Sequence, residues 1–239
     1  NGHGIGFGDI NGDDVADIVT AASRGPGLVN VFFVAAGASD PVPNSPGRAF
    51  QAFPSQYLGG ATVATADVGT FSGGVATNAS AADGRMEVVV GSGVGLAPQI
   101  RLYYLSTGVN LIRTITPFTP TFRGGVSVSA GRFDADAIDD IIVTGGYQSG
   151  SRIEIHSGRA PPGTSGVLAS RQAFAAIGAA NLPVFAVAIP PSTSGRFTTL
   201  AVIQISARGL GIRRLGVNPA TETVFASLSG PLRIAASRG

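Results

Sequence analysis

The feature of this sequence that most restricts its fold is an internal repeat of about 60 residues. Two copies, at residues 4–23 and 124–146, align without a gap from Gly8 against Gly131 onward and set Asp17 against Asp140. Extending the alignment divides the chain into four copies and a short remainder, at about residues 1–58, 59–123, 124–181, 182–229 and 230–239. Such a chain folds as repeated units that bury their apolar faces against one another.

Each copy contains the pattern of four short strands. The first run consists of small apolar residues, as in ATVATADV, and the second is a continuous apolar run, as in MEVVVGS, typical of a strand buried on both faces. The third run alternates, as a half-buried strand does. Arginines mark the fourth strand in three copies, at Arg48, Arg113 and Arg171, and a charge on an outermost strand discourages edge-to-edge pairing.

We therefore expect an all-β fold, a single β-propeller over residues 1–239 with four-stranded antiparallel blades, four repeats of about 60 residues and one extra strand. The extra strand, residues 230–239, aligns with the first strand of another copy. It belongs either to a further repeat of a longer array or to the closure of a four-bladed ring. Residues 170–181 have helical propensity, but the aligned segments do not, so we expect strand and loop there.

The composition excludes several classes of protein. Hydrophobic residues make up 44% and charged residues 13% of the chain, so disorder is not expected. Cysteine is absent, which excludes disulfides and thiol nucleophiles. All 16 basic residues are scattered arginines, so no nucleic-acid-binding surface is expected. The sequence has neither a run of about 18 apolar residues nor a signal peptide, so we expect no membrane insertion and interpret the chain as a mature piece or an excised fragment.

An acidic loop lies between the first two strands of the first copy. Its oxygen donors are the side chains of Asp9, Asn11, Asp13 and Asp17 and the backbone carbonyl of Val15. Acceptor oxygens at every second position of a tight loop converge on one point, as Ca²⁺ requires. The alternative is a strand-to-strand turn in which Asp, Asn and Gly only form Asx turns. Calcium is favoured because the same arrangement returns twice in the chain.

The two later copies of this loop depart from the first. The candidate ligands of the second copy are Asp67, Asp83 and Glu87. Those of the third copy are Asp134, Asp136 and Asp140. An insertion at about residues 70–81 interrupts the second loop, and Arg132 occupies the first ligand position of the third. In the third loop, either the Arg132 guanidinium pairs with one of the three carboxylates and replaces the ion, or calcium binds. The second loop can bind calcium only if its insertion folds out of the way.

The sequence contains no recognisable catalytic set. A Walker loop needs lysine, which is absent, and a serine hydrolase needs a histidine near its serine, whereas only His3 and His156 exist and no GxSxG elbow does. Eight of the 14 carboxylates lie in the first and third acidic loops, where metal binding explains them. Glu154 and Glu222 stand alone on expected strands, and we predict them at the surface. We therefore expect a protein that is not an enzyme.

The segment DINGDDVADIV, followed by a Gly-rich turn and an alternating strand, resembles the FG-GAP or VCBS repeats of integrin-α-type β-propellers. The similarity is closest to the repeat arrays of bacterial surface and secreted proteins. It implies a calcium ion between the first and second strands of a blade, held by Asp9, Asn11, Asp13, the Val15 carbonyl and Asp17. The family usually has Gly where this chain has Asp14, a residue that tolerates the left-handed conformation less well.

The resemblance implies a non-enzymatic, calcium-stabilised extracellular or cell-surface module for adhesion or assembly. Its expected partners are extracellular protein, polysaccharide and further repeats of the same array. Calcium affinity is expected to be weak, on the order of 10⁻⁴ to 10⁻³ M. The alternative is a lectin-like carbohydrate-binding propeller or an accessory domain of a secreted carbohydrate-active enzyme. Phe32, Tyr103 and Tyr104 would then stack on sugars instead of packing in the core.

Overall fold

The computed structural model describes residues 3–37, 46–78, 81–159, 166–172, 183–189, 199–206, 209–216 and 223–224. The predicted extra strand at 230–239 and Glu222 lie outside these residues. All regular structure in the described part is β-strand, which confirms the all-β prediction. No helix in this part is long and apolar enough to cross a membrane.

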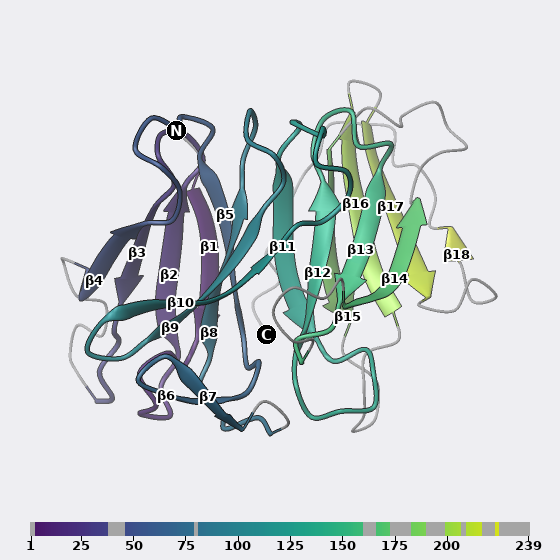
Figure 1. The fold of residues 1–239 in the computed structure, drawn as a ribbon. Coiled ribbons are helices and arrows are strands. Elements are labelled where there is room, and N and C mark those ends of the chain that lie inside the picture. The colour runs from purple at the N-terminus through teal and green to yellow at the C-terminus, as the bar shows by residue number, and fades with distance from the viewer. Residues whose placement is uncertain are drawn as a thin grey trace.

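The strands in the described part form four antiparallel sheets of four strands, and each sheet corresponds to one repeat (Figure 1). The first sheet contains β1 (His3–Gly8), β2 (Asp17–Ala22), β3 (Leu28–Phe32) and β4 (Arg48–Gln51). The second contains β5 (Ala61–Ala66), β8 (Glu87–Ser92), β9 (Ile100–Leu105) and β10 (Val109–Ile115). The third contains β11 (Val126–Gly131), β12 (Asp140–Gly145), β13 (Arg152–His156) and β14 (Val167–Gln172). The fourth contains β15 (Val184–Ile189), β16 (Thr199–Ser206), β17 (Gly209–Gly216) and β18 (Thr223–Val224).

A fifth, two-stranded sheet lies within the second repeat. It is a hairpin of β6 (Thr70–Ser72) and β7 (Val75–Asn78) in the connection between β5 and β8. The hairpin accounts for the insertion that the sequence places inside the second acidic loop. Because the insertion pairs with itself, β5 and β8 still pair in full register, from Ala61 opposite Ser92 to Ala66 opposite Glu87.

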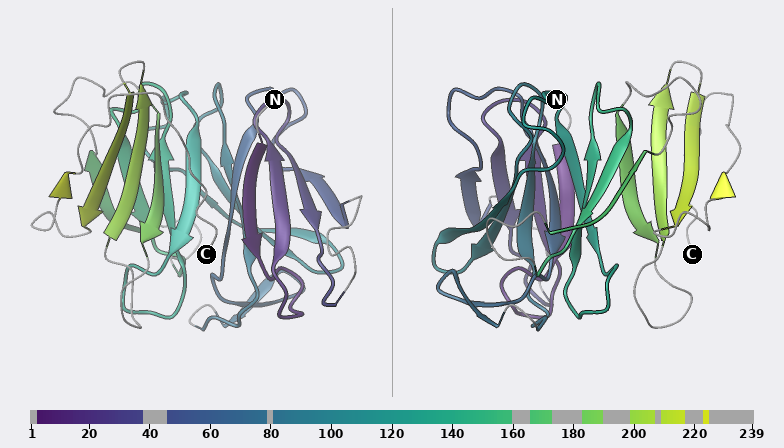
Figure 2. Two further views of the ribbon diagram at one scale, coloured as in Figure 1. Left: turned by 180° about the vertical axis from the view of Figure 1, so that it is seen from behind. Right: turned by 45° about the vertical axis from the view of Figure 1, so that its right-hand side comes forward.

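The sheets follow one another in chain order, and their first strands are neighbours. Strand β5 contacts β1 and β11, and β11 also contacts β15. Figure 2 shows the sheets side by side with the outer strands β4 and β18 at opposite ends of the molecule. Three separate apolar cores lie between consecutive sheets, because each sheet packs its face on that of the next.

The burial of the second strand depends on its sheet. Every residue of β8 and β12 is buried, as the continuous apolar runs predict, because neighbouring sheets cover both faces. In β2, burial alternates, so the prediction of a strand buried on both faces is wrong for the first repeat. The first sheet has a packed neighbour on only one side among the described residues.

Glycine allows the close approach of consecutive sheets at the ends of these strands. The Gly60 N–H donates to the carbonyl of Gly25, which lies in the first repeat, at 2.9 Å. A Cβ atom at Gly60 would overlap the backbone of Ser23 in the first repeat, and one at Gly125 would lie 2.9 Å from the backbone of Gly93 in the second. These turns therefore join neighbouring repeats as well as strands of one repeat.

Two of the fourth-strand arginines, Arg48 and Arg113, connect their sheet to the next, whereas the side chain of Arg171 lies outside the described part. Arg48 of β4 donates to the carbonyls of Ser106 and Thr107 in the β9–β10 turn, at 3.3 and 3.2 Å. Arg113 of β10 is buried and donates to the carbonyls of residues 157 and 158, at 2.9 and 2.8 Å. The sequence predicted that Arg113 would protect an exposed sheet edge. This prediction is wrong, because its guanidinium binds the next sheet. Burial lowers the pKa of Arg113 to about 10.

Candidate metal-binding loops

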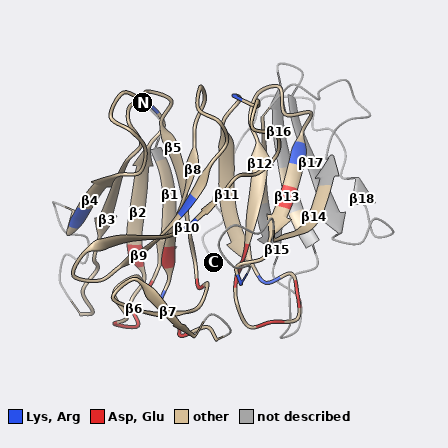
Figure 3. Cartoon of the chain, viewed as in Figure 1, with Lys and Arg blue, Asp and Glu red and all other residues tan. Residues whose placement is uncertain are grey.

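The three acidic loops lie between the first two strands of the first three sheets. We call them the first loop (residues 9–17), the second loop (residues 67–87, including the β6–β7 hairpin) and the third loop (residues 132–140). Because each loop follows the first strand of its sheet, the three share one end of the molecule, where Figure 3 shows acidic residues along the lower edge. The predicted ligands of all three loops therefore lie at the same edge of their sheets.

In the first loop, Asp9 closes the turn. One of its carboxylate oxygens accepts the N–H groups of Gly12 and Asp13 at 2.6 and 3.1 Å, and the other accepts that of Asp14 at 2.7 Å. Asp14 has φ 64°, the left-handed conformation that glycine adopts at lower cost. Asp9 thus stabilises the strained position through a backbone hydrogen bond.

Asn11 and Asp13 also bind within the first loop. The Asn11 side-chain amide donates to Asp13 at 2.9 Å, and its oxygen accepts the Asp13 N–H at 3.0 Å. The other oxygen of Asp13 accepts the Val15 N–H at 3.0 Å. These are Asx turns, the alternative to calcium in the sequence analysis.

A carboxylate at the start of the second strand recurs in all three loops. We call Asp17, Glu87 and Asp140 the strand-start carboxylates. Each is buried, and each accepts the N–H of the residue that follows the first ligand position of its loop. The donors are Ile10 at 2.9 Å, Val68 at 2.9 Å and Phe133 at 2.7 Å. The aligned residues therefore perform one structural role in three repeats.

The three strand-start carboxylates differ in what their second oxygen binds. In Asp17 it accepts the Val34 N–H at 2.9 Å, and in Asp140 it accepts the Gly158 N–H at 3.3 Å. In Glu87 the buried Oε1 has no hydrogen-bond partner among the described residues. Burial raises the pKa of Asp17, that of Asp140 to about 6 and that of Glu87 to about 9.

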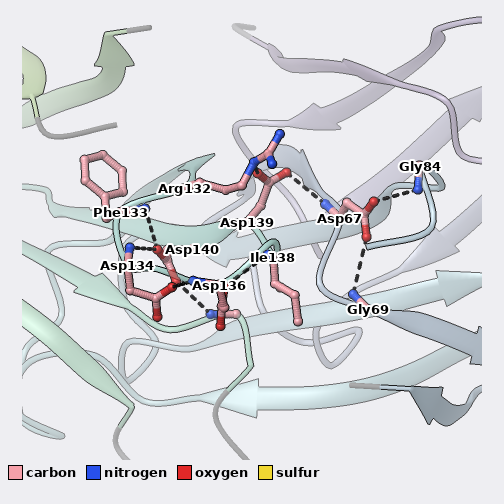
Figure 4. Close-up of polar contacts among 11 residues, drawn as sticks. Asp67, Gly69, Gly84, Arg132, Phe133, Asp134, Asp136, Ile138, Asp139 and Asp140 are labelled. Atoms are coloured by element: carbon pink, nitrogen blue, oxygen red, sulfur yellow. Dashed lines mark hydrogen bonds and ion pairs between the residues drawn. The ribbon is translucent and has the colours of Figure 1, made fainter. Parts of the chain in front are cut away.

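The second and third loops are bonded to each other (Figure 4). The Asp67 N–H donates to the side chain of Asp139 at 3.0 Å, and the Asp139 N–H donates to the Asp67 carbonyl at 2.8 Å. The Asp67 carboxylate accepts the N–H groups of Gly84 at 2.7 Å and Gly69 at 3.4 Å. Burial raises the pKa of both Asp67 and Asp139. Asp83, another predicted ligand of the second loop, accepts the Arg85 N–H at 3.0 Å.

In the third loop, Arg132 does not take the predicted partner. Its guanidinium lies 3.9 Å from Asp139, a residue outside the predicted ligand set. Asp134 accepts the Asp136 N–H at 2.9 Å, and Asp136 accepts the Ile138 N–H at 3.0 Å. The third loop thus repeats the Asx turns of the first.

Two residues that the sequence analysis missed connect the first and second loops. The Met86 N–H donates to the Asp9 carbonyl at 2.6 Å, in the same way that Asp139 donates to Asp67. Arg85 donates to the Ile10 carbonyl at 2.7 Å and to the Leu105 carbonyl, and its guanidinium stacks on Tyr104. Met86 directly precedes a strand-start carboxylate, as Asp139 does. That shared position in the repeat is the sequence feature from which these contacts could have been predicted.

The donors present fit the chemistry of a hard cation, because all predicted ligands are oxygens. The buried, unpartnered Oε1 of Glu87 also suits a cation. However, no three His, Cys, Asp or Glu side chains in the described ranges are grouped as in a metal site. The oxygens instead accept backbone N–H groups, so cation binding requires some of these side chains to turn.

Glu154 and His156 form a buried pair on β13, between the second and third sheets. His156 Nε2 lies 3.0 Å from Glu154, and Arg152 lies 3.2 Å from the other oxygen. The predicted surface position of Glu154 is therefore wrong. Burial alone favours the neutral acid, but the hydrogen bond from His156 and the Phe118 N–H lower the pKa of Glu154.

The aromatic residues of β9 belong to the core. Tyr103 and Tyr104 are both buried, and Tyr103 packs beside Phe50 with ring centroids 4.8 Å apart. They are therefore not available for stacking on a sugar.

Comparison of the chain with protein-family models, curated proteins and solved structures finds no match.

Proposed function

We propose that this protein is a non-enzymatic, calcium-stabilised extracellular module whose repeats mediate adhesion or assembly. The observation that carries the proposal is the set of strand-start carboxylates, Asp17, Glu87 and Asp140. All three are buried at the same edge of successive sheets, and burial raises the pKa of each. Burial makes the ionised form of each carboxylate costly, and neighbouring carboxylates of the same loop add to that cost. A bound cation would reduce both costs.

We infer a β-propeller arrangement for the repeats. Four-stranded antiparallel sheets follow in chain order, and the first strands of consecutive sheets are neighbours. Face-to-face cores between consecutive sheets support the same inference. A propeller presents its loops at two ends, which suits a module that binds other proteins or polysaccharides.

Calcium in the first loop would be held by the residues predicted from the sequence, namely Asp9, Asn11, Asp13, the Val15 carbonyl and Asp17. The corresponding ligands in the other loops are Asp67, Asp83 and Glu87, and Asp134, Asp136 and Asp140. The ion would supply positive charge to clustered carboxylates. The chain itself supplies a loop already closed by the Asp9 hydrogen bonds and anchored to β2 by Asp17. Extracellular calcium, in the millimolar range, suits a site of this kind.

Thermal unfolding with about 2 mM calcium and with excess chelator tests the calcium part of the proposal. We expect calcium to raise the unfolding midpoint by several degrees and Asp13→Ala to remove most of that gain. Asp14→Gly is the matched control, since it removes a carboxylate from the same loop at a position outside the ligand set. The control should keep the calcium response. If neither chelator nor Asp13→Ala has an effect, the loops are Asx turns only and the proposal is wrong.

A further inference from the structure

The first sheet has an apolar face with no neighbour among the described residues. Phe7, Ile18 and Phe32 lie opposite one another on β1, β2 and β3 and form one cross-strand row on this face. Phe7 is 59% exposed, and Ile5, two residues before it on the same face, is 55% exposed. Large side chains in adjacent positions at this exposure are unusual for a surface that faces only water.

In the next two sheets the second and third members of the corresponding row are buried, and the first is half-buried. In the second sheet the row is Thr65, Val88 and Tyr103. In the third sheet it is Ala130, Ile141 and His156. Val88 and Tyr103 pack in the core shared with the first sheet, and Ile141 packs in the core shared with the second. The row therefore marks the face with which a sheet receives its predecessor, and we call it the upstream face.

The opposite face of each sheet receives its successor, and we call it the downstream face. Val19, Val89 and Ile142 are aligned residues that point to this side, and each packs in the core shared with the following sheet. The three interfaces among the described residues thus each join one downstream face to one upstream face. The interface is heterologous, so repeating the same contact joins a face of one kind to a face of the other kind.

The downstream face of the fourth sheet also carries an exposed ring. On β15, Val184 and Ala186 are buried in the core shared with the third sheet. Phe185, between them, points to the opposite side and is 44% exposed. Phe7 and Phe185 thus mark the two ends of the row of sheets that have no packed neighbour among the described residues, and each end has the face that the other end lacks.

We propose that the upstream face of the first sheet binds the downstream face of the fourth sheet of a second copy of this chain. The contact continues the packing that the chain already uses three times, with Phe7, Ile18 and Phe32 in place of the buried rows. It is head-to-tail, so dimers keep one free face of each kind and can add further copies. The inference does not depend on calcium.

Sedimentation velocity of the full chain over micromolar to near-millimolar concentrations tests this contact. We expect the sedimentation coefficient to rise with concentration. Phe7→Asp and Phe185→Asp should each be monomeric over the same range, with far-UV circular dichroism unchanged. Val75→Asp is the control, because Val75 is exposed on β7, which pairs with β6 in the second repeat and belongs to neither the first nor the fourth sheet; this variant should associate like the parent.

Mixing the two monomeric variants gives the sharpest outcome. Each retains the face that the other has lost, so an equimolar mixture should form dimers and no larger species. A parent chain that stays monomeric throughout overturns the inference. A Phe185→Asp variant that associates like the parent also overturns it, because that result indicates contact between two upstream faces. Running the series with calcium and with chelator separates this test from that of the proposed function, because association should occur in both.

Discussion

The first and second loops solve the same structural problem with different residues. Asp17 binds backbone N–H groups through both carboxylate oxygens, whereas Glu87 uses only Oε2 and leaves Oε1 buried without a partner among the described residues. The first loop has Asp14 in the left-handed conformation, and the aligned residue of the second loop is Gly84 with φ 83°. Both loops thus have a buried carboxylate that accepts the backbone N–H at the start of the turn, whereas the residues at the other loop positions differ between the two repeats.

The largest effect should come from removing the better-satisfied carboxylate. Asp17→Ala leaves the N–H groups of Ile10 and Val34 without an acceptor, so we expect a loss of about 3 kcal/mol in the free energy of unfolding. Glu87→Ala removes only one such acceptor together with an unpartnered oxygen, and should cost about 1 kcal/mol. Urea denaturation in chelator measures both. Equal losses would show that the difference between the two carboxylates has no energetic consequence.

Arg85 of the second loop aligns with Val15 of the first, and Arg85→Val makes the two loops alike at this position. The substitution leaves the carbonyls of Ile10 and Leu105 without the guanidinium, so we expect a loss of about 2 kcal/mol. Urea denaturation again provides the measurement. Arg24→Val, at an exposed arginine, is the control and should stay within about 0.5 kcal/mol of the parent. A loss for Arg85→Val no greater than that of the control would contradict the structural role of Arg85.

The protonation of Glu87 predicts a pH dependence in the absence of metal. Its pKa is about 9 in the folded protein, mainly through burial, against 4.5 as the ordinary value. The folded state therefore holds a proton that the unfolded chain has released, and this stabilisation is complete below pH 4.5 and is lost as pH rises toward 9. Between about pH 7 and 9, Asp140 with its pKa of about 6 is largely ionised in both states.

In chelator, unfolding free energy should fall by about 1 kcal/mol or more between about pH 7 and 9 in the parent chain. Glu87→Gln should remove most of that fall, because glutamine does not titrate. Guanidinium denaturation at a series of pH values provides the measurement. A slope that is the same in parent and variant would mean that Glu87 is ionised throughout this range.

The smallest effect concerns the left-handed position. Asp14→Gly gives the first loop the residue that the second loop has, and should stabilise the protein by about 0.5 kcal/mol by relieving strain at φ 64°. Gly84→Asp, at φ 83°, is the reverse exchange and should destabilise it by a similar amount. Thermal unfolding of the two variants provides the measurement. A change of the same sign in both would contradict the equivalence of the two positions.

The repeat pattern predicted much of the fold from short-range information. Alternating and continuous apolar runs placed the four strands of each repeat, because strand burial has a period of two residues that local sequence displays. The acidic residues were predicted in loops between first and second strands, where the structure has them. The insertion in the second loop was also recognised, although its hairpin was not.

By itself, the sequence determined the all-β class, the four repeats and the loops in which carboxylates gather, because these follow from residue spacing within one repeat. Contacts between repeats were decided only by the tertiary structure. It joins Asp67 to Asp139, places Arg85 against Ile10, buries Arg113 against the third sheet and leaves Phe7 exposed. The physical reason is that a side chain's partner and charge state depend on which sheet covers it, and residues distant in sequence supply that sheet.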